Sequence, residues 1–267
     1  MSFFKIVKRS GIRFSALIVL VSFSLCGCTG GITENLNDEP LSFSTEYDLN
    51  RELPETFAPS DGYSNGGCFY VVWSAENVSY GDDGMSLSIE ERDDRLYGAE
   101  MRSIRHYGYG DYEVRMKPSA KAGTASTFFL YTGEFDDPDG DGKGNPHDEI
   151  DIEFLGKTPT KVQLNFFASG RGGHEYMLDL GFDATKEFHD YGFRWTENYI
   201  VWFVDGKPVY KVYDSPFDPI PKTPSDIFMS YWSGSKDAVG WMGAFEYSGV
   251  TSAEYQWVRT TASPMSY

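Results

Sequence analysis

Short stretches in which every second residue is apolar run along most of this chain. In residues 111–118, apolar side chains alternate with charged ones, the pattern of a strand that buries one face. Residues 198–213 hold two such stretches on either side of Asp205-Gly206, a dipeptide that favours a two-residue hairpin turn. We expect further strands at 68–73, 85–90, 124–131, 161–168, 187–195, 226–232 and 251–259. Because we see no long helical period and no internal repeat, the sequence predicts an all-β sandwich with Greek-key connections.

Size and charge limit the possible functions. The chain has 267 residues, 40% of them hydrophobic and 16% aromatic, which is enough to fill the core of one all-β domain. Its formal net charge is −17, and loss of residues 1–27, which hold four basic and no acidic residues, would give −17 − 4 = −21. Such an acidic surface argues against binding to nucleic acid or to anionic membranes. A neutral partner such as a polysaccharide is compatible with it.

The first residues have the composition of an export signal. Four basic residues precede an apolar run over residues 14–25, about a dozen residues long, whereas a membrane-spanning helix needs roughly 20. The run ends in LCGC (25–28), which resembles the bacterial lipoprotein box and implies cleavage before Cys28 and diacylation of that cysteine. An ordinary signal peptide with incidental cysteines is the alternative. Since two acyl chains give stable attachment, we expect an exported lipoprotein anchored at the cell surface or in the periplasm.

The remaining chain divides into a linker and a domain. After the signal at 1–27, the small and polar residues of 28–46 are typical of a tether, and 47–267 is expected to be one folded domain. Cys68 is then alone and cannot form an internal disulfide, so we expect it to be a buried filler rather than a nucleophile. The histidines at 106, 174 and 189 lack metal-ligand spacing, and solvated or structural roles are expected for them.

The stretch HDEIDIEFLG (147–156) places three acids at alternating positions. Glu149, Asp151 and Glu153 share one face of a strand, and the apolar residues between and after them face the core. Like charges roughly 7 Å apart raise the pKa of at least one carboxyl. Glycoside hydrolysis uses such a set, since one carboxylate attacks the anomeric carbon while a protonated partner serves the leaving oxygen. Spacing alone leaves a metal-binding or merely solvated acidic face open, because the outer Cα atoms are about 13 Å apart.

The surrounding sequence resembles glycoside hydrolase family 16, and within it the bacterial lichenases, which are endo-1,3-1,4-β-glucanases. The resemblance keeps its order from about residue 57 to 259. Its blocks are DEIDIEFLG (148–156), DGYSNGG (61–67), AEMRS (99–103), YGYGDYEVRMKP (107–118), FFLYTG (128–133), TKVQLNFF (160–167), GGHE (172–175), LGFDATKEFHDYGFRW (180–195) and AEYQWV (253–258). It implies a concanavalin A-like jelly-roll sandwich whose concave face binds glucan, and hydrolysis of mixed-linkage 1,3-1,4-β-glucan with retention of configuration. The sequence does not settle the oligomeric state, for which a monomer is the default expectation.

The resemblance also implies roles for particular residues. Glu149 matches the nucleophile, Asp151 the assisting acid and Glu153 the general acid/base, and the chemistry needs no cofactor. The acids alternate without the extra residue that relatives specific for 1,3-glucan often carry, although xyloglucan-modifying relatives lack it too. Sugar contacts are implied for Tyr63, Asn65, Glu100, Arg102, Tyr131, Asn165, Trp232 and Trp241. By composition alone, most of these aromatic residues would be expected in the core.

Several positions depart from the family pattern. His147 stands where the family commonly has Trp, Ser230 where it has Asn and Phe167 where it often has Tyr. The bacterial disulfide is missing, because its positions fall near Val71 and on Gly98. Gln256 replaces the usual Asp of a structural calcium site, which weakens that site since Gln has no charge.

An insertion at 136–148 precedes the acidic strand. Its residues Asp137, Asp139 and Asp141 have the spacing of a calcium loop, while a solvated turn is the plainer interpretation. Together with His147, this insertion leaves rival specificities open: cleavage of 1,3-glucan or xyloglucan, transglycosylation, or a surface lipoprotein that binds glucan without cutting it.

Overall fold

The computed structural model describes residues 36–50, 54–137 and 140–265. The export signal, Cys28 and Asp139 lie outside the described residues. One compact unit begins at Leu36. Within the described residues no helix combines the length and apolarity needed to cross a membrane. The helical segments described are η1 (Ala75–Asn77), η2 (Lys236–Ala238) and α1 (Val239–Met242).

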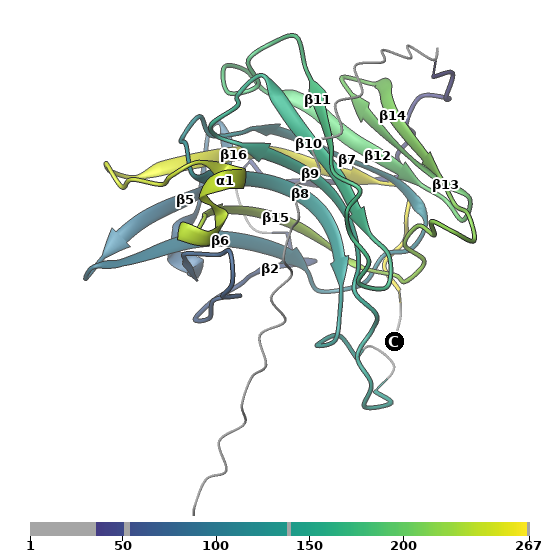
Figure 1. Cartoon of the computed structure of the whole chain (residues 1–267), viewed down its shortest axis with the longest axis horizontal. Coiled ribbons are helices and arrows are strands. Elements are labelled where there is room, and N and C mark those ends of the chain that lie inside the picture. Colours follow the sequence, from purple (N-terminus) through teal and green to yellow (C-terminus); the bar gives the residue numbers. More distant parts are fainter. Residues whose placement is uncertain (1–35, 51–53, 138–139, 266–267) are drawn as a thin grey trace, which may run out of the picture. The chain divides into compact units, whose positions relative to one another are not determined.

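One layer of the fold is a sheet that we call the acidic sheet (Figure 1). Its strands, in spatial order, are β11 (Tyr176–Asp179), β10 (Lys161–Phe167), β9 (Asp148–Leu155), β8 (Thr124–Thr132), β15 (Asp226–Ser233) and β6 (Arg95–Ser103), with β2 (Phe57–Pro59) beyond β6. The short β3 (Val72–Trp73) also pairs with β6. Strands β8 and β15 are neighbours although they are far apart in the chain, as Greek-key connections require.

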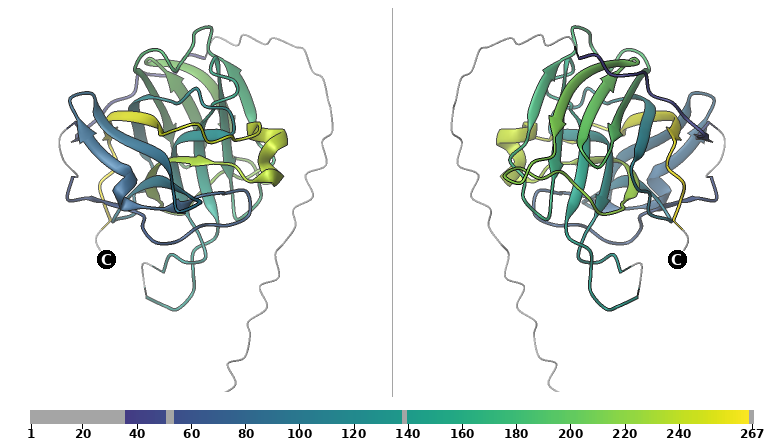
Figure 2. Two further views of the ribbon diagram at one scale, coloured as in Figure 1. Left: turned by 90° about the vertical axis from the view of Figure 1, so that its left-hand side faces the viewer. Right: turned by 90° about the vertical axis from the view of Figure 1, so that its right-hand side faces the viewer.

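The second layer, the back sheet, pairs its strands antiparallel. Its order is β14 (Lys207–Tyr213), β13 (Tyr199–Val204), β12 (His189–Trp195), β7 (Gly110–Lys117), β16 (Thr251–Thr260), β5 (Gly84–Arg92) and β4 (Val78–Gly81), with β1 (Thr45–Asp48) beside β16. The hairpin of β5 and β6 joins the two sheets. Figure 2 shows the two curved layers from both sides. This is the expected all-β jelly-roll sandwich.

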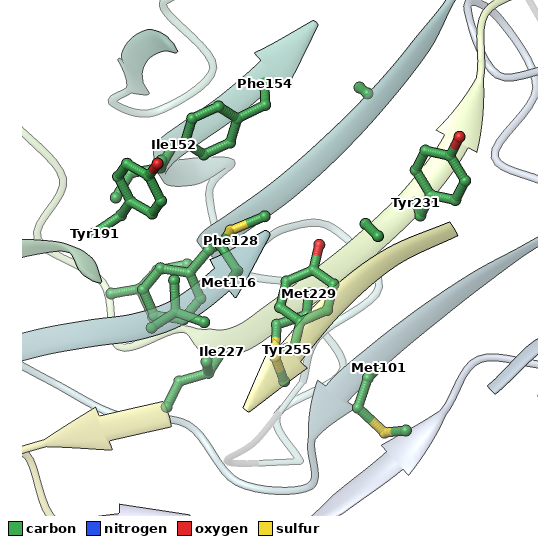
Figure 3. Packing of buried hydrophobic residues seen from close by; sticks show 14 of the residues in the cluster. Met101, Met116, Phe128, Ile152, Phe154, Tyr191, Ile227, Met229, Tyr231 and Tyr255 are labelled. Atoms are coloured by element: carbon green, nitrogen blue, oxygen red, sulfur yellow. The ribbon is translucent and has the colours of Figure 1, made fainter. Parts of the chain in front are cut away.

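Side chains from both sheets fill the space between the layers (Figure 3). On β9, Ile152 and Phe154 point inward, and the Phe154 ring meets Tyr191 of the back sheet at 4.6 Å. Two hydrogen bonds also cross the core. The Trp202 indole donates to the Asp151 carbonyl at 3.1 Å, and the Tyr255 hydroxyl donates to the Thr127 carbonyl at 3.1 Å. The back sheet therefore fixes the strand that carries the acids.

Most predicted strands are present, but the short strands β1, β2, β4 and β11 were not predicted, and two further differences stand out. Only Val72–Trp73 of the predicted strand 68–73 pairs as a strand, while Phe69 makes an isolated bridge to Gly234. Strand β6 was not predicted, because the sequence RLYGAEMRS has no clean alternation. It buries Glu100 and the apolar residues on both sides of it, so its polar residues do not mark an exposed face.

The predicted tether 28–46 is partly attached to the back sheet. The side chain of Asp38 is only 8% exposed and lies between Lys211, at 2.6 Å, and Arg194, at 3.7 Å. The Ser42 amide donates to Asp111 at 2.9 Å, and β1 begins at Thr45. The folded unit thus extends N-terminal to residue 47.

Candidate active site

The three acids of β9 project from the acidic sheet, because the residues between them are held in the core. Ile150 and Ile152 are 1% exposed, so Glu149, Asp151 and Glu153 must face the other way. Neighbouring strands extend this face in rows. Tyr131 and Phe167 flank Glu149, Phe129 and Asn165 flank Asp151, and Thr127 and Gln163 flank Glu153.

Glu149 is held by neighbours on its own strand. One of its carboxylate oxygens lies 2.6 Å from Nε2 of His147, and a hydrogen bond joins it to Asp151. The His147 ring stacks on Phe167 at 4.8 Å and meets the edge of Tyr131 at 5.3 Å. The side chain of Glu149 keeps 20% of its surface exposed, so a ligand can reach it.

Asp151 is buried at the centre of the row. Burial raises its pKa well above the usual range, and the adjacent charges of Glu149 and Glu153 raise it further. The raised pKa favours the protonated form of Asp151, which donates its hydrogen to Glu149. Asn165 also hydrogen-bonds to Asp151 from the next strand.

Glu153 is protonated as well. Burial and, next, the charge of Glu149 raise its pKa to about 8, against a lowering by the Gln163 amide. That amide donates to Glu153 at 2.7 Å, and its oxygen accepts from the Trp241 indole at 3.0 Å. Gln163 was not predicted as a site residue, although it lies two residues before Asn165 on the same face of a predicted strand.

The other predicted sugar contacts reach the site to different degrees. Tyr131 and Asn165 adjoin the acids, whereas Glu100 and Arg102 lie on β6, separated from β9 by β8 and β15. Glu100 is buried and accepts from Ser60 at 2.6 Å, and burial raises its pKa to about 7. Tyr63 donates to the same serine at 2.9 Å. Arg102 is exposed at the surface.

Two of the predicted contacts are engaged within the protein. Asn65 accepts from the Trp73 indole at 2.9 Å. Trp232 is only 3% exposed and lies under Phe69, with ring centroids 4.0 Å apart, so its ring is covered. Trp241 is partly exposed and is therefore the more accessible of the two predicted aromatic platforms.

The departures from the family pattern are accommodated locally. The Ser230 hydroxyl pairs with Thr127 at 2.7 Å. A Cβ placed on Gly98 would come within 2.9 Å of the Val71 side chain, so the two positions of the missing disulfide do lie together. Cys68 is partly buried rather than fully buried, and burial raises the pKa of its thiol to about 11, which makes it a poor nucleophile.

Two of the three residues proposed for calcium, Asp137 and Asp141, lie within the described residues and are engaged with other groups. Asp141 pairs with Lys143 at 2.9 Å, and Asp137 accepts from the Gly142 amide at 3.0 Å. The side-chain amide oxygen of Gln256 accepts from the guanidinium of Arg115 at 3.1 Å. Because a cation next to a guanidinium is repelled, the Gln256 position does not fit the calcium site of the family.

A cluster of one histidine and two aspartates was not expected from the sequence. Within the described residues, one group of His, Cys, Asp or Glu side chains has ligand atoms within 4.8 Å of one another, and it consists of His106, Asp136 and Asp226. These atoms are close enough to share a cation or a proton. His174 and His189 have the expected structural roles, since they pair with Asp218 at 3.0 Å and Asp205 at 2.8 Å.

A β-sandwich that presents a protonated acid and a second carboxylate side by side on one face has the composition of a glycoside hydrolase site. Comparison with known proteins agrees. Residues 65–257 match the model of Glycosyl hydrolases family 16. A β-glucanase of Paenibacillus macerans is 41% identical over 249 residues, which cover 92% of this chain and 97% of the relative. The chain belongs to glycoside hydrolase family 16.

Solved structures show the same relationship. The β-glucanase of Bacillus licheniformis superposes with a TM-score of 0.75 at 41% identity, covering 82% of this chain and 98% of the other. A prokaryotic β-1,3-1,4-glucanase (lichenase) derived from a mouse hindgut metagenome gives 0.73 at 40% identity, covering 83% and 99%.

Proposed function

We propose that this glycoside hydrolase is a retaining endo-β-glucanase acting on mixed-linkage 1,3-1,4-β-glucan. The observation that carries the proposal is the pairing on β9 of Glu149, whose carboxylate accepts hydrogen bonds, with Glu153, whose pKa is raised to about 8. One is prepared for attack and the other for proton donation. The β-glucanases and the lichenase of similar sequence support the choice of substrate.

The reaction then runs in two displacements. Glu149 attacks the anomeric carbon and the bond to the leaving oxygen breaks, while Glu153 gives its proton to that oxygen. Water next enters, Glu153 takes its proton, and the hydroxide attacks the same carbon and releases Glu149. Asp151 assists by donating its hydrogen bond to Glu149. Each step moves only protons and electron pairs, so no cofactor is required.

Glu149→Gln is expected to lower kcat on barley β-glucan by at least about 1,000-fold while leaving binding of the polymer intact. In Glu149→Ala, added azide should enter in place of the carboxylate and restore turnover of a glucoside with a good leaving group, giving an α-glycosyl azide. Glu246→Gln, which changes an exposed acid away from the site, serves as the control. Full activity in Glu149→Gln would contradict the assignment.

Substrate choice is tested by release of reducing ends from barley β-glucan, laminarin and xyloglucan in parallel. Release from the mixed-linkage glucan alone supports the proposal. Activity mainly on laminarin or xyloglucan would keep the mechanism and change the substrate, and transfer products would indicate transglycosylation. Binding without cleavage would favour a glucan-binding lipoprotein.

We also propose that the protein is exported and anchored through lipid on Cys28, on the strength of its N-terminal sequence. Membrane fractionation and mass spectrometry of the N-terminal peptide test this. The Cys28→Ser variant is expected to lose the acyl mass and leave the membrane fraction. An unmodified Cys28 would instead indicate an ordinary signal peptide.

A further inference from the structure

The residue before β9 contacts the proposed nucleophile directly. Nε2 of His147 lies 2.6 Å from Oε2 of Glu149. A carboxylate can only accept, so the ring donates its Nε2 hydrogen. Asp151 donates to the same carboxylate from the other side along the strand. Glu149 is therefore held between two donors, one of them a residue that is commonly Trp in the family.

The imidazole ring is itself held in place. Phe167 stacks on it, with an interplanar angle of 16°, and Tyr131 meets it edge-on. These two residues are also the register partners of Glu149 on β10 and β8. The backbone carbonyl of His147 accepts from the Gly170 amide at 2.7 Å, which fixes the start of the strand. Tyr131 and Phe167 therefore adjoin both the His147 ring and Glu149.

We propose that His147 is a positioning residue for Glu149. Its Nε2 hydrogen bond holds one carboxylate oxygen, so that the other is aimed at the anomeric carbon, and it stabilises the negative charge that Glu149 needs before attack. The inference rests on the proposed function and adds to it. Where the family commonly has an indole that can stack on a sugar, this chain has a hydrogen-bond donor to the nucleophile. The proposed alignment of the Glu149 carboxylate offsets the loss of the indole surface.

Two variants separate the donor from the ring. His147→Phe keeps a ring on Phe167 but has no donor, whereas His147→Gln keeps an N–H near the position of Nε2 but has no ring. If His147 positions Glu149, His147→Phe should lower kcat on barley β-glucan by roughly 10- to 100-fold, the range for a lost hydrogen bond to a charged group, with KM nearly unchanged. His147→Gln should keep kcat within about threefold of wild type.

A third measurement asks whether His147 acts through Glu149. In the Glu149→Ala background rescued by azide, adding His147→Phe should leave the rate unchanged, because the group being positioned has gone. A further loss in that background would show that the ring contacts sugar instead. Wild-type kcat in His147→Phe together with a raised KM in His147→Gln would also overturn the proposal. An equal loss of kcat in both variants, accompanied by a lower unfolding temperature, would overturn it as well, because the residue would then be needed only for stability.

Failure of this inference is distinguishable from failure of the proposed function. If Glu149→Gln stays active or azide gives no α-glycosyl azide, the assignment of the nucleophile fails. If azide rescue works and His147→Phe is fully active, only the positioning role fails.

Discussion

The proton on Glu153 is a property of its surroundings. A glutamate in water has lost its proton near pH 4.3, yet in this protein burial and the charge of Glu149 raise the pKa of Glu153 to about 8. Gln163 acts in the opposite direction by donating to the carboxylate, and Trp241 holds Gln163 in place. The pKa of the proposed general acid thus depends on burial and on the side chains of Glu149, Gln163 and Trp241.

The pH profile of the enzyme should report this proton. Because Glu153 must hold its proton to donate it, kcat/KM should fall as pH rises through about 8. Gln163→Leu removes the hydrogen bond that lowers this pKa, so the alkaline limb should move to higher pH. Initial rates between pH 5 and 10 test both statements. A limb that stays in place in Gln163→Leu would assign it to another group.

The same pKa shift should affect stability. The folded state keeps the Glu153 proton up to about pH 8, whereas the unfolded chain loses it near 4.3, so this contribution to stability is full below about pH 4.3 and lost as pH rises through 8. Glu153→Gln cannot ionise. Thermal unfolding should therefore show this variant gaining stability over wild type from pH 5 to pH 9. An unchanged difference across that range would contradict the raised pKa.

At the scale of elements, β9 is positioned by the back sheet as well as by its neighbours. Trp202 on β13 is fully buried and donates across the core to the Asp151 carbonyl. Trp202→Phe should cost about 1–3 kcal/mol of stability through the lost bond and the volume removed. It should also lower kcat roughly threefold or more, because the central acid loses its anchor.

Trp195→Phe is the matched control for Trp202→Phe. Trp195 is equally buried and donates to the Pro221 carbonyl at 2.9 Å rather than to a strand that carries the acids. Its loss should reduce stability to a similar extent and leave kcat unchanged. Unfolding in denaturant and steady-state kinetics on both variants provide the comparison. Equal kcat in the two variants would show that the cross-core bond matters only for stability.

The contact of β3 with β6 is too close to admit a side chain at Gly98. Ala at this position would place its Cβ 2.9 Å from both the Val71 side chain and the Tyr231 carbonyl, distances that force a shift. Gly98→Ala should therefore destabilise the domain by about 1–3 kcal/mol. Gly81→Ala, where a Cβ meets nothing within 4 Å, should have little effect in the same denaturation experiment. Equal stability of the two variants would mean that β3 can move away.

For the whole molecule, the excess of negative charge acts on stability. At a formal net charge of −17 the chain repels itself, and salt should raise its unfolding temperature by screening that repulsion. Arg115 already donates to the side chain of Gln256, and Lys143 already pairs with Asp141. Calcium should therefore raise the unfolding temperature no more than sodium does at equal ionic strength. Calorimetry in matched CaCl2 and NaCl tests this. Extra stabilisation by calcium, lost in Asp137→Asn, would instead support the calcium loop.

The sequence by itself determined the strand class and the acidic row. Alternation with a period of two depends only on neighbouring residues, so it identified β9 and placed Glu149, Asp151 and Glu153 on one face. The same local pattern identified the hairpin of β13 and β14. The resemblance to the family added the fold topology, which local periodicity cannot supply.

Tertiary structure alone decided which acid holds a proton and what surrounds it. The protonation of Glu153 depends on burial and on Gln163 and Trp241, which lie on separate segments brought together by strand pairing and loop packing. Strand β6 escaped prediction because it is buried on both faces and so lacks an alternating pattern. The contact of His147 with Glu149 likewise depends on a ring held by β8 and β10. Local sequence specifies the direction of a side chain, whereas its electrostatic environment arises only when distant segments pack together.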